Sequence, residues 1–238
     1  MASFDSPGVH ATPEDRAPAL SRLEKHLPPL LSVIAGMVDL TGFLSLNLFT
    51  AHITGNLVVV GALVVRGGRV NPAQILAIPV FILAVAATWL FARISGARGP
   101  ALLRQLLLVQ FLLLVLVSVF SVITKPSSAP HALMATIAAM MAVSAMACQF
   151  ALLRLAMPVA PSTAVMTGNL TNAVLWALDT VSPDTSSAAT DLVRLKNSLY
   201  LLFGFFAGCV AAAIAVTYLG DWAWAFPAVL AGMAVAMS

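Results

Sequence analysis

The sequence carries little charge. Only 9% of its 238 residues are Asp, Glu, Lys or Arg, whereas 61% are hydrophobic, and the net charge is +3. A soluble domain has roughly 25% charged residues, so this chain has too few to cover a surface that faces water. Its apolar runs are long and continuous, unlike the short alternating segments of a transmembrane β-barrel. The composition therefore predicts an all-α membrane protein, a polytopic helical bundle whose outer surface contacts the lipid bilayer.

Cysteine and histidine are also scarce. The two cysteines, Cys148 and Cys209, lie within apolar runs and are interpreted as small buried hydrophobic residues. The four histidines show no metal-ligand spacing. The sequence contains no nucleophile–base arrangement, no phosphate-binding loop, and no basic stripe with interleaved aromatic residues. These absences predict a protein that is not an enzyme, uses no metal or cofactor, and binds no nucleic acid.

The first 26 residues differ from the rest of the chain. They are polar, contain three prolines and mixed charges, and lack the apolar core that follows the basic start of a cleaved signal peptide. We expect residues 1–26 to form a disordered cytoplasmic tail. The first transmembrane helix would then serve as an uncleaved anchor.

Apolar runs long enough for membrane-spanning helices, which need about 20 such residues, fill the remaining chain. The first, from Leu27 to Val65, is too long for one helix and too short for two with a loop. We divide the chain into a first transmembrane repeat, 27–124, and a second, 131–238. The later apolar runs cover about 73–92, 102–123, 132–157, 162–181, 195–219 and 222–237.

Two short segments of the two halves are almost identical. Residues 50–57 read TAHITGNL and residues 163–170 read TAVMTGNL, so six of eight positions agree without a gap. Each segment lies at or beside a break in an apolar run. The first break covers residues 47–53 and the second covers residues 157–162. We expect each segment to open a short helix capped by Thr54 or Thr167. Gly55 and Gly168 allow the backbone beside each break to adopt conformations that other residues disfavour.

The number of crossings decides how the two halves are related. In one arrangement, each broken pair, a long helix and the short helix after it, makes one net crossing. The chain then crosses the membrane six times, three times in each half, and an odd number of crossings per half makes the repeats inverted. Eight crossings would make them parallel. The six-crossing arrangement agrees with the positive-inside rule. It places most of the basic residues in the cytoplasm, namely Arg22, Lys25, Arg93, Arg98, Arg104, Arg194 and Lys196, and it leaves Arg66, Arg69 and Lys125 outside. We therefore expect inverted repeats that contain two short broken helices.

The first half also resembles a known family. Residues 35–44 read AGMVDLTGFL and residues 49–56 read FTAHITGN, a pattern similar to that of the YoaK-like family of bacterial multi-pass inner-membrane proteins, a domain of unknown function. A second, weaker copy begins near Ala147-Cys148-Gln149-Phe150. The resemblance implies a bacterial plasma-membrane protein with about six spans. It supplies no activity and no substrate.

Asp39 and Arg154 are the most unusual charges in these runs. Asp39 lies near the middle of the first predicted helix, where a charge costs roughly 2.5–3.5 kcal/mol and usually serves a function. Arg154 falls at nearly the equivalent place in the second half and is the candidate partner of Asp39. The pair would be structural, or Arg154 would attract an anionic solute while Asp39 exchanges a coupling proton. A further alternative is that Asp39 is a neutral, protonated carboxyl group that is hydrogen-bonded to a neighbouring helix. Alternatively, Arg154 extends to the interface from a helix end.

The broken helices offer further polar groups. The N–H groups that open a short helix favour a small anion or a carboxylate. Alternatively, Asn56 and Asn169 only satisfy backbone groups that the breaks leave free. His52 is a candidate proton relay or a structural hydrogen-bonded residue, and Gln149 lies beside the second break.

These features favour a small inner-membrane secondary transporter or permease for a small solute, with an anion as the preferred cargo and a proton as the candidate coupling ion. The competing hypothesis is a non-transporting scaffold, sensor or subunit of a larger complex. The sequence leaves the solute and homo-oligomer formation open. The predicted substrate-binding residues are Asp39, His52, Thr54, Gly55, Asn56, Gln149, Arg154, Thr167, Gly168 and Asn169.

Overall fold

The structure, a computed structural model, describes residues 13–67, 71–158, 160, 162–163, 165–181 and 188–238, and of residues 13–25, 181 and 188–190 only the backbone. Within this part of the chain every regular element is helical, which confirms the predicted all-α membrane class. The α-helices are α1 (Pro13–Leu46), α2 (Ile53–Arg66), α3 (Pro72–Ser95), α4 (Gly99–Thr124), α5 (Leu133–Ala156), α6 (Met166–Val181), α7 (Ala188–Leu219) and α8 (Ala225–Met237), with 3₁₀ turns η1 (Pro126–Ser128) and η2 (Gly220–Trp224).

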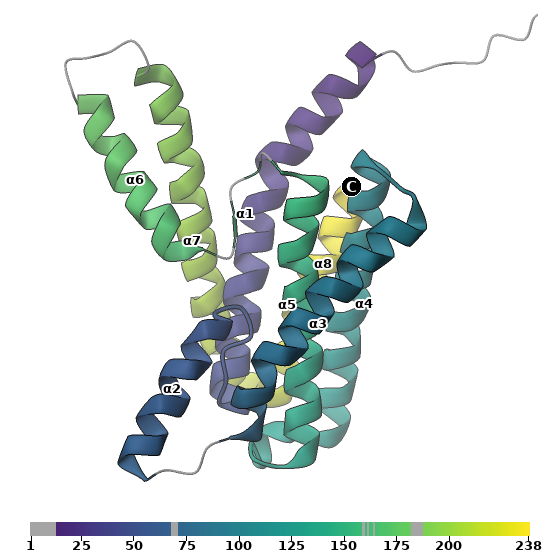
Figure 1. Cartoon of the computed structure of the whole chain (residues 1–238), viewed down its shortest axis with the longest axis vertical. Coiled ribbons are helices and arrows are strands. Elements are labelled where there is room, and N and C mark those ends of the chain that lie inside the picture. Colours follow the sequence, from purple (N-terminus) through teal and green to yellow (C-terminus); the bar gives the residue numbers. More distant parts are fainter. Residues whose placement is uncertain (1–12, 68–70, 159, 161, 164, 182–187) are drawn as a thin grey trace, which may run out of the picture.

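Five helical stretches are long and apolar enough to span a membrane. The last of them, Asp191–Met237, contains two helices, because η2 separates α7 from α8 and α8 runs back beside α4 (Figure 1). Gly220 opens η2 with φ +54, a left-handed conformation that glycine adopts without steric cost. The other four stretches are His26–Leu46, Pro72–Ser95, Gly99–Thr124 and Leu133–Ala156.

The long helices alternate in direction. In Figure 1, α1, α4 and α7 run from the upper end of the molecule to the lower end, and α3, α5 and α8 run back. The short helices do not follow this pattern. Helix α2 begins at middle height and runs to the lower end, whereas α6 begins at middle height and runs to the upper end. The two short helices therefore extend toward opposite ends of the molecule. The segments that precede them, 47–52 between α1 and α2 and 157–165 between α5 and α6, are called the first and the second break below.

Helices α1 and α5 form the centre of the bundle. Helix α1 packs against α7, α5 and α8, and α5 packs against α3, α4 and α1, while α2 lies on α3 and α6 lies on α7. The α1–α7 contact depends on glycine, because a Cβ atom at Gly36 would overlap the Phe205 carbonyl oxygen and one at Gly208 would overlap that of Val33. Small residues allow two backbones to approach closely in a membrane, where apolar burial against lipid gains little.

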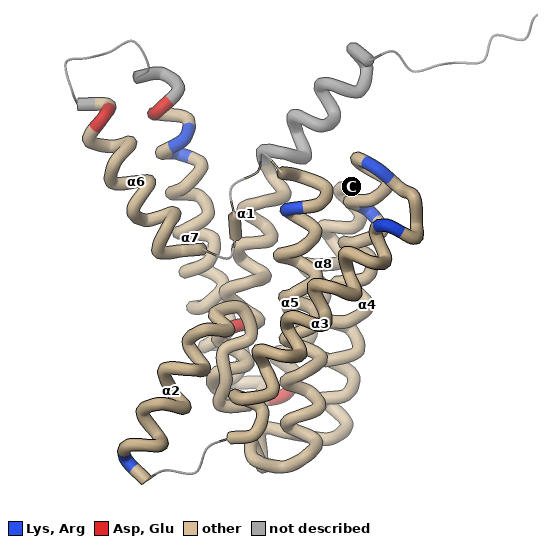
Figure 2. Tube along the Cα trace, in the orientation of Figure 1, with Lys and Arg blue, Asp and Glu red and all other residues tan. Residues whose placement is uncertain are grey.

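Basic residues gather at the upper end, as Figure 2 shows. They lie near the junction of α3 and α4, at the end of α5 and at the start of α7. The described members of this group are Arg93, Arg98, Arg104, Arg154, Arg194 and Lys196. Arg66, in the last turn of α2, and Lys125, just after α4, belong to the lower end.

The N-terminal segment differs from the predicted tail. Helix α1 begins at Pro13, so residues 13–26 continue the first long helix. Residues 1–12 lie outside the described part of the chain.

Candidate functional site

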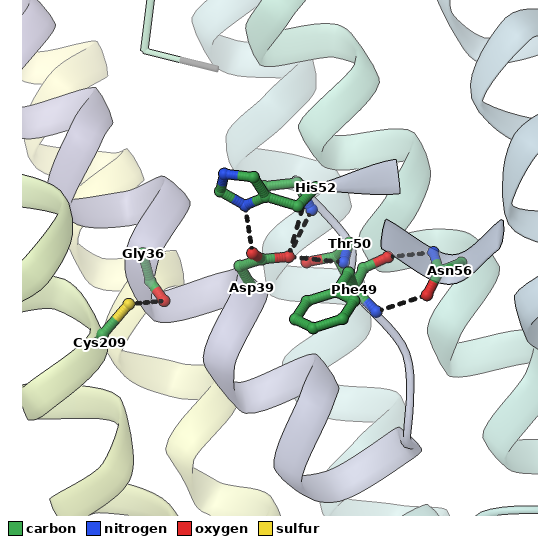
Figure 3. Close-up of polar contacts among 8 residues, drawn as sticks. Gly36, Asp39, Phe49, Thr50, His52, Asn56 and Cys209 are labelled. Atoms are coloured by element: carbon green, nitrogen blue, oxygen red, sulfur yellow. Dashed lines mark hydrogen bonds and ion pairs between the residues drawn. The ribbon is translucent and has the colours of Figure 1, made fainter. Parts of the chain in front are cut away.

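The carboxylate of Asp39 binds the chain segment that connects α1 to α2. Its side chain projects from the middle of α1 and is only 5% exposed. Oδ1 accepts hydrogen bonds from the N–H groups of Thr50 at 2.8 Å, Ala51 at 2.7 Å and His52 at 3.3 Å (Figure 3). These N–H groups precede the first turn of α2, so the carboxylate supplies acceptors that the start of a helix lacks. The negative charge of the carboxylate also interacts favourably with the partial positive charge at the N-terminal end of α2.

The second carboxylate oxygen binds His52. Asp39 Oδ2 lies 2.6 Å from His52 Nδ1, a charge-assisted hydrogen bond when the imidazole is protonated. The imidazole is 39% exposed, and its edge packs against the ring of Phe205 from α7, with centroids 5.2 Å apart. The outer nitrogen, Nε2, has no hydrogen-bond partner among the described residues. His52 therefore connects the buried carboxylate to the surface of the bundle.

The segment between α1 and α2 is folded tightly against α1. Asn47 has φ +57, a left-handed conformation that asparagine tolerates and that often ends a helix. The chain then passes over Gly42, where a Cβ atom would lie 2.7 Å from Cγ2 of Thr50. Asn71 and Gln74, at the start of α3, donate to the carbonyl oxygens of Leu46 and Asn47 at 3.1 and 2.8 Å. Neighbouring helices thus satisfy the backbone groups that the break leaves free, as a nonpolar environment requires.

The two predicted asparagines bind backbone atoms in the same way. Asn56 accepts a hydrogen bond from the Phe49 N–H through Oδ1 and donates to the Phe49 carbonyl oxygen through Nδ2, both at 2.8 Å (Figure 3). In the second half, Asn169 Nδ2 donates to the Ser162 carbonyl oxygen at 2.8 Å. Each asparagine reaches seven residues back along the chain, so both breaks share this local geometry. Both side chains thus bind backbone polar groups at the breaks.

The predicted threonine caps are wrong. Helix α2 begins at Ile53, so its capping position is occupied by His52, whose side chain makes no capping hydrogen bond, and Thr54 is exposed within the first turn. Helix α6 begins at Met166, which places Thr167 in the first turn as well, and Thr167 is also exposed. At α2 the N–H groups of Thr50, Ala51 and His52, which precede the helix, are bound by the Asp39 carboxylate and not by a threonine hydroxyl.

The glycines of the two motifs allow close packing within each break. A Cβ atom at Gly55 would lie 3.1 Å from the ring of Phe49, and one at Gly168 would lie 2.9 Å from Cγ1 of Val165. Both contacts are tighter than ordinary van der Waals distances. The glycines therefore hold the start of each short helix against the segment before it.

Gln149 belongs to a second buried network. Its Nε2 donates to the Leu31 carbonyl oxygen of α1 at 2.8 Å and lies 3.3 Å from Thr163 Oγ1 in the second break. Its Oε1 accepts a hydrogen bond from Gln110 of α4 at 2.6 Å. Both glutamines are fully buried. Gln149 thus links the second break to α1 and α4, two helices of the first half, and it makes no hydrogen bond to Asp39.

Asp39 and Arg154 are not brought together. In the described part of the chain, the ion-pair partner of Asp39 is His52, and Arg154 is exposed in the last turn of α5. In the ungapped alignment of the two halves Leu152, which is fully buried, stands at the position of Asp39. Arg154 follows it by two residues, a rotation of about 200° around the helix, and so faces another direction.

The sequence reasoning missed several groups at this site. The N–H groups of Thr50 and Ala51 carry no side-chain signature, and Phe205 comes from a helix of the other half. Gln110 stands out in the sequence as a polar residue in an apolar run that needs a partner, and the structure shows that this partner is Gln149. No group of three or more His, Cys, Asp or Glu side chains that could hold a metal ion occurs within the described residues. The site therefore consists of a carboxylate and an imidazole joined by one hydrogen bond, and side chains of these two types are the ones that most often accept or donate protons in proteins.

Comparison with known proteins identifies a family and nothing further. Residues 27–237 match the family described as "Protein of unknown function (DUF1275)". No curated protein and no solved structure matches the chain.

Proposed function

We propose that this chain, a member of the DUF1275 family of proteins of unknown function, is a multi-pass membrane transporter that moves a small solute, with a proton as the coupling ion. The observation that carries the proposal is the Asp39–His52 pair, a buried carboxylate bonded to a half-exposed imidazole where a broken helix begins. Ionisable side chains within membrane-spanning helices are costly and commonly mark ion and substrate pathways.

The arrangement of the helices supports transport. Many secondary transporters contain inverted repeats, with discontinuous helices whose ends meet near the middle of the bilayer. Here α2 and α6 begin at middle height and run to opposite ends (Figure 1). The helix contacts also correspond between the halves, because α1 packs on α7 as α5 packs on α3, and α1 packs on α8 as α5 packs on α4. We infer six net crossings made by two inverted repeats, 27–124 and 131–238.

The orientation follows from the distribution of positive charge. Lys and Arg residues gather at the upper end (Figure 2), and cytoplasmic loops carry an excess of these residues. We therefore place the upper end in the cytoplasm. The bacterial plasma membrane, which the family resemblance implies, is the proposed location.

The mechanism that we propose couples protonation to the position of α2. Asp39 holds the N–H groups of three consecutive residues, Thr50, Ala51 and His52. A proton that enters through the exposed edge of His52 and passes to Asp39 neutralises the carboxylate. Hydrogen bonds to a neutral acceptor are about half as strong as those to a charged one. The first break would then loosen, and α2 would be free to move against α1.

Transport can be tested with the purified protein in liposomes. Uptake of a panel of labelled small solutes would be measured under an imposed proton gradient, with empty liposomes as the background. We expect at least one solute to accumulate with the wild-type protein and with Asp179→Asn, an exposed carboxylate on α6. Asp39→Asn should fold but fail to accumulate it. Gradient-driven uptake that survives in Asp39→Asn would contradict the assigned role.

Thiol labelling tests the access that transport requires. Thr54→Cys and Thr167→Cys would be introduced after Cys148 and Cys209 are replaced by Ala, and a membrane-impermeant reagent would be applied from each side. We expect the two positions to be labelled from opposite sides. Leu83→Cys, in the middle of α3 and 68% exposed, should be shielded by lipid and remain unlabelled. Protection of Thr54→Cys and Thr167→Cys from both sides would exclude alternating access.

A non-transporting scaffold or subunit is the second candidate. The observation that favours it is that both oxygens of Asp39 already have partners, so the polar groups of the first break are satisfied within the protein. A scaffold predicts protection in the labelling experiment and no solute uptake. The two measurements together therefore separate the two functions.

A further inference from the structure

A cavity lies beside the second break. It has a volume of about 360 Å³, within the usual range of about 300–1,000 Å³ for small-molecule sites. Helices α3 and α5 and the break provide its walls. The residues that matter here are Phe81 and Trp89 of α3, Phe150 and Arg154 of α5, and Ser162 and Val165 of the break. The wall is mainly apolar and aromatic, and Arg154 is its single charged side chain.

The Arg154 guanidinium has no carboxylate partner among the described residues. A guanidinium presents its N–H donors in a planar fork that matches a carboxylate, and the resulting hydrogen bonds are among the strongest in proteins. The cavity is therefore suited to a ligand that carries one negative charge.

The first break is bound by a carboxylate, and the second break has no carboxylate at the aligned position. At the first break, the Asp39 carboxylate accepts hydrogen bonds from Thr50, Ala51 and His52. In the ungapped alignment of the halves, Leu152 replaces Asp39, and Thr163 and Val165 stand at the positions of Thr50 and His52. The N–H groups of Thr163 and Val165 have no acceptor within the part of the chain that the structure describes.

The comparison is justified by a shared local geometry. Asn56 binds the Phe49 carbonyl oxygen and Asn169 binds that of Ser162 at the same distance, 2.8 Å, so the two breaks share this side-chain contact. One break thus contains its own carboxylate. The other has none at the aligned position, and it lies at a cavity that contains a cation.

We propose that this cavity binds a small monocarboxylate with an apolar or aromatic body. The carboxylate bonds to Arg154 and lies near the second break, and the body packs against Phe81, Trp89 and Phe150. The inference rests on the proposed function, because it names the class of solute that is carried. Binding itself is independent of transport and is measured separately.

Binding can be measured with labelled benzoate and the full-length protein in lipid nanodiscs. We expect saturable binding of benzoate and none of benzamide, which has a similar shape but no charge. Arg154→Gln should weaken binding by about 10- to 100-fold, because hydrogen bonds to charged groups are worth roughly that factor. Arg154→Lys should retain part of it. Arg104→Gln is the matched control, because Arg104 is also exposed on the same end of the bundle and lies outside the cavity wall, and it should bind as the wild type does.

Several results would overturn this site. Equal binding of benzoate and benzamide, or unchanged binding in Arg154→Gln, would remove the role of the charge. Binding of decanoate without binding of benzoate would assign the cavity to a lipid-derived carboxylate and contradict a small solute. If benzoate binds through Arg154 but no solute is transported, the site stands and the proposed function fails. If another solute is transported and benzoate does not bind, the function stands and this site fails.

Discussion

His52 Nδ1 lies 2.6 Å from Asp39 Oδ2, although 13 residues separate the two side chains in the sequence. The other oxygen of the same carboxylate accepts three backbone N–H groups. A single side chain therefore fixes the position of the first break and holds the one histidine of that break. This dual role makes Asp39 the residue whose replacement should have the widest consequences.

Asp39→Ala should strongly destabilise the protein. The substitution leaves buried N–H groups without an acceptor and His52 without its partner, and removal of one member of a buried charged pair typically costs about 3–5 kcal/mol. Asp39→Asn should cost less, because its amide oxygen still accepts hydrogen bonds. Thermal unfolding in detergent would measure both. Asp179→Ala, at an exposed site of α6, is the control and should unfold like the wild type; an equal loss in both alanine variants would contradict the assigned role.

His52→Gln should uncouple solute transport from the proton gradient. Imidazole titrates near neutral pH, whereas an amide does not, so the variant can keep a hydrogen bond to Asp39 but cannot relay a proton. We expect the wild-type protein to accumulate solute against its gradient and the variant only to equilibrate it. The measurement is uptake into liposomes with and without an imposed pH difference. Accumulation by His52→Gln that equals the wild type would exclude His52 from the proton path.

Gly36→Ala and Gly208→Ala should each weaken the contact between α1 and α7. The added Cβ atoms would overlap backbone carbonyl oxygens of the facing helix, which cannot rotate away as a side chain can. Overpacking of this kind typically costs about 1–3 kcal/mol. Gly61→Ala is a suitable control, because no atom lies within 4 Å of a Cβ atom at that position in α2. There the substitution should stabilise the helix by about 1 kcal/mol. Similar unfolding temperatures for all three variants would contradict the close approach.

Asn56→Ala should loosen the first break and Asn169→Ala the second. Asn56 binds both backbone polar groups of Phe49, and leaving buried groups of this kind without partners costs about 1–3 kcal/mol. Hydrogen–deuterium exchange of the peptides that contain residues 47–52 and 157–165 would report the opening of each break. Asn172→Ala, at an exposed position of α6, should leave both peptides unchanged. Unchanged exchange in the first two variants would show that the asparagines are not structural.

The prediction of the Asp39–Arg154 pair shows where sequence reasoning stops. Both residues stand out in the sequence, because a charge in an apolar run is visible without a structure. Their pairing was inferred from near-equivalence in the two halves, but Arg154 is offset by two residues from the aligned Leu152 and points elsewhere on its helix. The actual partners of Asp39 are mostly backbone groups, which no pattern of side chains reveals.

The sequence by itself determined the class of the protein, the long apolar helices and the places where two of them are interrupted. These properties depend on local composition, because a run of about 20 apolar residues favours a spanning helix wherever it occurs. Only the tertiary structure decided that Asp39 binds His52, that Gln149 joins Gln110 to the second break, and that Arg154 lines a cavity of its own. Each of these depends on how the chain reverses after a helix and on which helix then packs against it, and so it cannot be read from neighbouring residues.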